Sequence, residues 1–155
     1  MVDIVLVEPE IPQNTGNIIR LAANTGSTLH LIEPLGFQLE DKKMRRAGLD
    51  YHEFAAITVH TGWQHFRENT GEHRHLLGFS TRGSKPYSSI NFEPDDFIVF
   101  GSETRGLPGH VRKDIGLGNI YRIPMKPGSR SLNLSNAVAI MIYQAWQQDH
   151  FSGGS

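Results

Sequence analysis

Four segments rich in small hydrogen-bonding residues each follow a short apolar run of the chain. They cover residues 8–20, 80–85, 101–108 and 123–137, and the last of them reads IPMKPGSRSLNLSNA. Segment 101–108 places the carboxylate of Glu103 and the guanidinium of Arg105 between glycines. Segment 123–137 offers hydroxyl and amide side chains just before a long apolar run. Backbone N–H groups at the entrance to a helix can bind a nucleoside or a carboxylate, so these segments predict a polar ligand site.

The apolar runs between these segments predict the elements that position them. Short apolar or alternating runs predict buried strands at 4–7, 28–33, 55–60, 75–80, 96–101 and 119–124. Helical patterns lie between several of these runs, so the chain is predicted to be an α/β protein with a parallel sheet and helices on both faces. Ligands of parallel sheets bind beyond the carboxyl ends of the strands. We therefore expect the four segments to form one site, although each of them alone could simply be a turn.

Residues with capping or turn preferences predict where the helices begin and end. Gly26 is expected to end a helix that includes Ile18, and Pro108 suits the first turn of a short helix. Asn133 or Ser135 can cap the final helix. Its buried stripe is predicted to consist of Leu134, Val138, Met141, Ile142 and Ala145. A short charged helix is expected over 40–47.

Composition excludes several classes of protein. The chain has 155 residues, a net charge of −1 and no cysteine, which excludes disulfides, zinc–thiolate sites and cysteine nucleophiles. No apolar run approaches the roughly 18 residues that a membrane span needs, and no signal peptide is recognisable. These features favour a cytoplasmic protein that does not bind membranes. The weak net charge implies that any RNA partner is bound by a local cluster of cations.

Common nucleotide and metal motifs are missing from the sequence. Neither G-x-G-x-x-G nor the P-loop pattern occurs, which argues against a dinucleotide site or an NTPase. H-E-x-x-H is absent too, and the HRH stretch at 73–75 is interpreted as a solvated polar turn rather than as a metal site. No metal site is predicted.

Three stretches together resemble the motifs of the SPOUT-class RNA 2′-O-methyltransferases: PQNTGNIIRLAANTG (12–26), FGSETRGLP (100–108) and IPMKPGSRSLNLSNAVAIMIYQAW (123–146). The short length and the start EPEIPQNTGNIIR resemble most the single-domain bacterial members that act on tRNA. The resemblance implies one SPOUT domain over 1–151, whose C-terminal segment forms a deep trefoil knot. The tail 152–155 is expected to be disordered.

The resemblance also implies an activity. Members of this kind transfer a methyl group from S-adenosylmethionine to the ribose 2′-OH of the wobble cytidine or uridine in the anticodon loop of leucine tRNAs. S-Adenosylhomocysteine is the product and no metal is needed. Two alternatives stay open, namely 2′-O-methylation of another RNA such as rRNA, and a module that binds the cofactor or a nucleoside without catalysis.

Site residues follow from the resemblance position by position. Arg20 matches the arginine held central to catalysis, although by the residues alone it would be an exposed arginine in a surface ion pair. Asn14 and Glu103 are expected around the reaction centre. The cofactor residues are expected to be Phe79, Gly101, Ile123, Met125, Ser131, Leu132 and Asn133.

Partners are expected to be tRNA and a second copy of the chain. Tyr143 matches a residue implicated in tRNA handling and dimer contacts, and the family dimerises with its active site at the interface. Cations expected to contact RNA are Lys42, Lys43, Arg45, Arg46, Arg82, Lys85, Arg105, Lys126 and Arg130. Apolar side chains on the last helix beyond its buried stripe are compatible with a homodimer.

Overall fold

A computed structural model describes residues 1–39, 53, 56–71 and 74–155. The strands are β1 (Asp3–Val7), β2 (Leu29–Ile32), β3 (Ile57–His60), β4 (Leu76–Phe79), β5 (Lys85–Pro86), β6 (Phe97–Phe100) and β7 (Ile120–Arg122). The helices are α1 (Pro12–Thr25), α4 (Trp63–Thr70), α5 (Gly109–Ile115) and α6 (Leu134–Gln148), with 3₁₀ turns at Tyr87–Ser89 and Leu117–Asn119. The predicted helix at 40–47 lies outside the described residues.

The strands form one sheet in the order β3-β2-β1-β6-β4-β7-β5, and every described pairing is parallel. β1, β6, β4 and β7 are therefore consecutive neighbours. These are the four strands that precede the four polar segments. Because parallel strands end at the same edge, this order brings the segments to one end of the sheet, as the sequence predicted.

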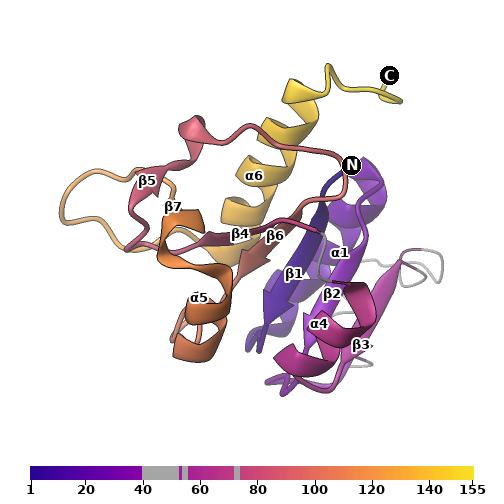
Figure 1. The fold of residues 1–155 in the computed structure, drawn as a ribbon. Helices are drawn as coiled ribbons and strands as arrows, with labels where there is room; N and C mark the ends of the chain where they lie inside the picture. Colours follow the sequence, from indigo (N-terminus) through magenta and orange to yellow (C-terminus); the bar gives the residue numbers. More distant parts are fainter. Residues whose placement is uncertain (40–52, 54–55, 72–73) are drawn as a thin grey trace.

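Helices cover both faces of the sheet (Figure 1). Alternate residues of β1 show why: Ile4 and Leu6 pack in the cluster with α1 and α6, whereas Val5 and Val7 pack in the cluster with α4 and α5. The predicted α/β fold with helices on both faces is confirmed. The trefoil knot and the domain limits stay predictions.

Helix ends agree with the predicted capping residues. Gly26 has φ 78° and its N–H donates to the carbonyl of Ala22, which ends α1. The side chain of Asn133 accepts the N–H of Ser135 at 2.9 Å and caps α6. Pro108 is the N-cap of α5 and so lies just before the helix. All five residues of the predicted stripe on α6 are buried.

One local feature differs from the sequence prediction. β5 pairs with Tyr121 and Arg122 of β7, although its two residues fall in a stretch that the sequence presents as a polar loop. A strand of two residues carries no detectable periodicity. The expected disorder of the tail 152–155 stays a prediction.

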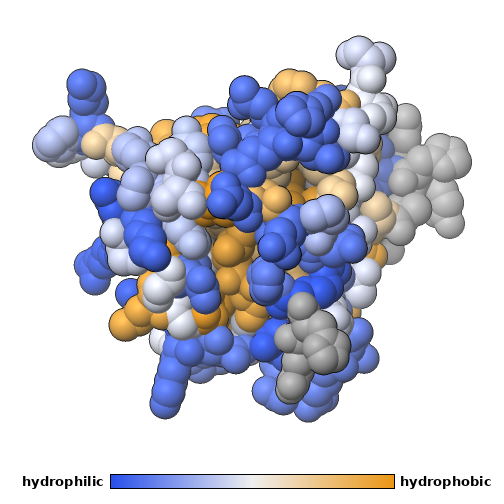
Figure 2. Space-filling view, turned by 45° about the horizontal axis from the view of Figure 1, so that its top comes forward, coloured by the Kyte–Doolittle hydropathy of each residue, from blue (hydrophilic) through white to orange (hydrophobic). Residues whose placement is uncertain are grey.

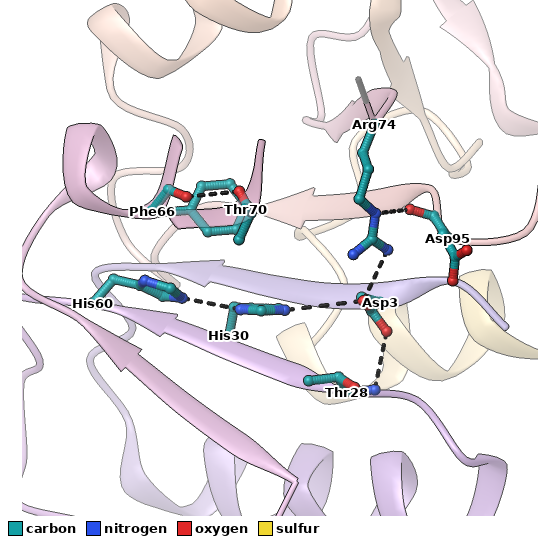
Figure 3. A network of polar contacts seen from close by, with 8 residues as sticks. All are labelled: Asp3, Thr28, His30, His60, Phe66, Thr70, Arg74 and Asp95. Carbon is teal, nitrogen blue, oxygen red and sulfur yellow. Dashed lines mark hydrogen bonds and ion pairs between the residues drawn. The ribbon is translucent and has the colours of Figure 1, made fainter. Parts of the chain in front are cut away.

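A buried polar network lies on the α4 side of the sheet (Figure 3). Arg74 donates to Asp3 at 2.8 Å and to the carbonyl of Asp95. Asp3 lies 4.0 Å from Nε2 of His30, whose Nδ1 is 3.0 Å from Nε2 of His60. Burial opposes ionisation of Asp3, but its polar contacts with His30 and Arg74 outweigh this effect and hold the pKa of Asp3 below its usual value. The network ties β1, β2 and β3 together.

Among the described helices, none is both long and apolar enough to cross a bilayer.

Candidate functional site

A cavity of about 580 Å³ lies where β4, β6 and β7 end. This size is typical of small-molecule sites. Its wall includes all seven residues expected to bind the cofactor: Phe79, Gly101, Ile123, Met125, Ser131, Leu132 and Asn133. The tertiary structure thus brings together residues that are up to 54 positions apart in the sequence.

Stacked aromatic rings give the cavity an apolar floor. Phe79 ends β4 and Phe100 ends β6, and their ring centroids are 4.9 Å apart with planes inclined by 15°. Both are paired across the sheet and almost fully buried. The floor can therefore support a flat apolar group such as a nucleobase without having to move.

Gly101 is required by the chain itself. A Cβ at this position would lie 2.0 Å from the carbonyl carbon of Gly106 and 2.2 Å from the nitrogen of Leu107. The loop folds back through a hydrogen bond from the Gly106 N–H to the Ser102 carbonyl at 3.0 Å. Gly101 therefore permits close approach of the returning loop, which shapes one wall of the cavity.

Glu103 binds the start of α1. Its carboxylate accepts the backbone N–H groups of Glu10 at 2.9 Å and Ile11 at 2.6 Å, and the side-chain amide of Asn14 at 3.3 Å. Ile11 is the N-cap of α1 and has no side chain that could cap the helix. Glu103 thus binds the backbone just before the helix from a distant loop, where the positive end of the helix dipole favours a carboxylate.

Asn14 extends this contact to the cofactor segment. Its Oδ1 accepts from Nδ2 of Asn133 at 2.9 Å, and Oδ1 of Asn133 accepts from the Ser135 hydroxyl at 2.6 Å. We call Glu103, Asn14, Asn133 and Ser135 the polar chain. It joins three of the four segments, so the geometry indicates that Glu103 and Asn14 position the site.

Arg20 does not line the cavity. It lies on α1, and its Nε is 3.6 Å from Oε2 of Glu53. The side chain is 46% exposed, as expected from the residues alone for an arginine on a helix face. One chain therefore does not place this guanidinium among the cofactor residues.

The predicted RNA contacts divide into two groups. Arg82 and Arg105 line the cavity, and Nε of Arg105 lies 3.7 Å from Glu10. Lys85, Lys126 and Arg130 are exposed but do not line it. Lys42, Lys43, Arg45 and Arg46 lie outside the described residues.

Tyr143 is on α6, is 46% exposed and does not line the cavity. Its ring centroid is 5.7 Å from that of Trp146. Its expected role in tRNA handling and dimer contacts stays a prediction.

Glu10 lies just before α1 and is bound by the loop after β6. The Thr104 hydroxyl donates to its Oε1 at 2.7 Å. Hydrogen bonds from Thr104 and Ser102, with the charge of Arg105, hold the pKa of Glu10 below its usual value. The loop therefore grips α1 by a second carboxylate contact.

Arg112 is a cavity residue that the sequence prediction missed. It lies in the last turn of α5 and reaches the cavity half-buried. The sequence does not single out Arg112, because Lys113 follows it and both residues look like ordinary charged residues at the end of a helix.

A separate ionic group surrounds His75. Its Nδ1 is 3.6 Å from Oε2 of Glu93 and 3.4 Å from Oδ1 of Asp96. Burial raises the pKa of Asp96 above its usual value. The fold brings these carboxylates to the HRH stretch although the sequence places them far from it.

The parallel sheet and its nucleoside-sized cavity define an α/β protein that binds a small ligand at the carboxyl ends of its strands. A model of the SpoU rRNA Methylase family matches residues 1–143. A relative from Burkholderia ambifaria, the tRNA (cytidine(34)-2′-O)-methyltransferase, is 54% identical over 156 residues and covers 100% of both chains. The chain belongs to the SpoU rRNA methylase family.

Solved structures agree with this assignment. One concerns 2′-OH methylation of C/U34 on tRNA; it is 41% identical, has a TM-score of 0.89 and covers 97% of this chain and 91% of the other. AviRb from Streptomyces viridochromogenes, a SpoU methyltransferase solved with AdoMet, shares the fold at 24% identity with a TM-score of 0.79. There the match covers 100% of this chain and 59% of AviRb.

Proposed function

We propose that this protein transfers a methyl group from S-adenosylmethionine to the ribose 2′-OH of the wobble nucleotide, cytidine or uridine, in tRNA, leucine tRNAs included. The observation that carries the proposal is the single cavity lined by all seven expected cofactor residues in a chain 54% identical to a relative of that activity. A cytoplasmic location is part of the proposal, because the tRNA substrate is there.

The cavity suits the cofactor. Its volume is about 580 Å³, its floor is aromatic, and Ile123 and Met125 lie in its wall. Backbone groups near a nucleobase can bind its polar edge while Phe79 and Phe100 support its face. When bound, S-adenosylmethionine supplies a methyl group activated by its sulfonium.

The residues of the chain contribute mainly orientation. The polar chain holds segments 8–20, 101–108 and 123–137 in one arrangement. Correct orientation of the reactants can by itself lower the activation free energy by about 7–11 kcal/mol. A guanidinium stays protonated in proteins, so Arg20 would hold a phosphate or the 2′-oxygen and stabilise its developing charge.

A homodimer completes this proposal. Arg20 does not line the described cavity of its own chain, so a second copy would deliver this guanidinium to the site. Ile140 and Tyr143 of α6 are 37% and 46% exposed, which is apolar surface that a partner could cover. In Figure 2, which turns the top of Figure 1 forward, apolar surface is exposed between hydrophilic patches.

Mixed dimers test this arrangement. Arg20→Ala and Gly101→Ala are each expected to be inactive, but dimers of one of each would contain one intact site. Their mixture should recover about a quarter of wild-type activity by random pairing. No recovery, with light scattering showing dimers, would place Arg20 and the cavity of one chain in the same site.

The activity itself is tested with labelled S-adenosylmethionine and tRNA that lacks the modification. Label at the 2′-O-methyl of position 34, mapped by mass spectrometry, is the expected result. Label only in rRNA would favour the alternative substrate. Cofactor binding without any transfer would favour a binding module. Full activity after chelation is expected, because displacement at a sulfonium needs no metal.

A further inference from the structure

Two guanidinium groups stand at the cavity without a carboxylate partner. Arg82 follows β4 and is exposed, and Arg112 approaches half-buried from α5. The ion pairs within the described part of the chain join neither of them to an acid. By contrast Arg105, the third arginine of the wall, lies 3.7 Å from Glu10.

No acid of the wall balances this charge. Glu103 is the acidic residue in the described lining, and its two oxygens already accept three N–H groups at the start of α1. The described lining therefore carries three arginines, Arg82, Arg105 and Arg112, against one carboxylate, which makes it locally positive.

Helix stabilisation does not account for the position of Arg112. A cation in the last turn of a helix is favoured by the dipole, but Lys113 occupies the same turn. Lys113 is exposed and does not line the cavity, whereas Arg112 reaches the wall. Of these two adjacent cations, Arg112 is therefore the one placed to meet a ligand in the cavity.

We propose that Arg112, together with Arg82, forms a subsite for a phosphodiester of the RNA substrate next to the nucleotide that is methylated. The inference rests on the proposed function and assigns a recognition role to a helix outside the three motifs. A guanidinium can bind two phosphate oxygens at once, which fixes the orientation of the bound strand.

A phosphodiester fits this subsite better than the cofactor carboxylate does. S-Adenosylmethionine carries a sulfonium and an ammonium besides its single carboxylate, so two uncompensated guanidiniums would repel it overall. RNA carries one negative charge per nucleotide, and a strand entering the cavity necessarily passes its rim. Arg82 is exposed at that rim.

The test compares Arg112→Ala with Lys113→Ala, a matched control that removes the same charge from the next residue. Binding of an anticodon stem-loop is measured by fluorescence anisotropy at several salt concentrations, and binding of S-adenosylhomocysteine by calorimetry. Arg112→Ala should weaken RNA binding about tenfold and lower the salt slope by about one. Lys113→Ala should change RNA binding less than twofold, and neither variant should change the affinity for S-adenosylhomocysteine.

Two results would overturn the subsite. Equal RNA binding by both variants would reduce Arg112 to a helix-end cation, and weaker binding of S-adenosylhomocysteine by Arg112→Ala would assign it to the cofactor carboxylate. Arg112→Lys keeps the charge but loses the paired N–H donors of the guanidinium, so it should retain only part of the affinity for RNA. Thermal melting of each variant verifies folding. The methyl-transfer assay of the wild-type protein is independent of this test. Its failure would refute the proposed function, while the RNA-binding comparison would still decide whether the subsite exists.

Discussion

Two polar networks on the same sheet are built in opposite ways. The polar chain at the cavity lies among loops at the carboxyl ends of the strands, and its contacts are hydrogen bonds of 2.6–3.3 Å. The network beneath α4 connects strands inside the protein. There His30 Nε2 and His60 Nδ1 are buried without a hydrogen-bond partner among the described residues.

The difference separates function from stability. Loops lack the regular backbone hydrogen bonds of paired strands, so the loops at the cavity depend on side chains such as Glu103 to hold them together. The strands beneath α4 are already paired, and their histidines instead introduce groups that are costly to charge when buried. Changes to the first network should thus affect methyl transfer, and changes to the second should affect folding and its dependence on pH.

Gly101→Ala is expected to have the largest effect. The new Cβ would overlap backbone atoms of Gly106 and Leu107, which cannot move without opening the loop. We expect a loss of about 3 kcal/mol or more in the free energy of unfolding, with loss of cofactor binding. Gly109→Ala is the control, since a Cβ there meets nothing within 4 Å. Urea unfolding and calorimetry compare the two, and wild-type binding by Gly101→Ala would contradict the packing argument.

Glu103→Gln comes next, because it leaves one N–H at the start of α1 without a carboxylate oxygen. Hydrogen bonds to charged groups contribute about 1.5–3 kcal/mol, so kcat/KM should fall about 10- to 100-fold. The shape of the pH–rate profile should be unchanged if Glu103 only positions the site. Glu10→Gln, a neighbouring change at a carboxylate that is 27% exposed, should cost far less. Disappearance of one ionisation from the profile of Glu103→Gln would instead identify Glu103 as the base.

His60 tests the second network through pH. Burial, with the charges of His30 and His65, lowers the pKa of His60 from 6.5 to about 4. Between these two pH values, His60 is therefore protonated in the unfolded chain and neutral in the folded protein. The free energy of unfolding should fall as pH drops from 6.5 to 4, by at most about 1.4 kcal/mol per pH unit, and this group adds no further loss below pH 4.

The groups around His60 include Phe66 and, beyond His30, the Asp3–Arg74 pair. Urea unfolding at pH 7 and 5 should show less acid sensitivity in His60→Gln than in the control His110→Gln, which alters an exposed histidine. Methyl transfer at pH 7 should be similar in both variants. Equal acid sensitivity would show that His60 does not titrate in this way.

The smallest effects are expected at the rim of the cavity. Lys126 and Arg130 are exposed on the loop before α6. Removing either charge should weaken tRNA binding about two- to threefold at low salt and hardly at all at high salt, since exposed ion pairs are weak and screened. Binding titrations at two salt concentrations measure this. An effect that persists at high salt would indicate a direct base or sugar contact instead.

Much of the fold could be predicted because each element carries its own pattern. The buried stripe of α6 has helical spacing, and Gly26 ends α1 in the left-handed conformation that glycine adopts without cost. β5 could not be predicted, since two residues have no periodicity and form a strand only beside β7. Residues 40–47 remain a prediction.

The candidate site divides along the same line. The sequence by itself determined the polar segments, their position after strands and, through the three motifs, the residues of the cavity wall, because these depend on local pattern and order along the chain. Only the tertiary structure placed Arg112 in the wall, bound Glu103 to the backbone before α1, and left Arg20 beside Glu53. The physical reason is that strand order and the return of distant loops decide which side chains meet, and no local pattern encodes those distances.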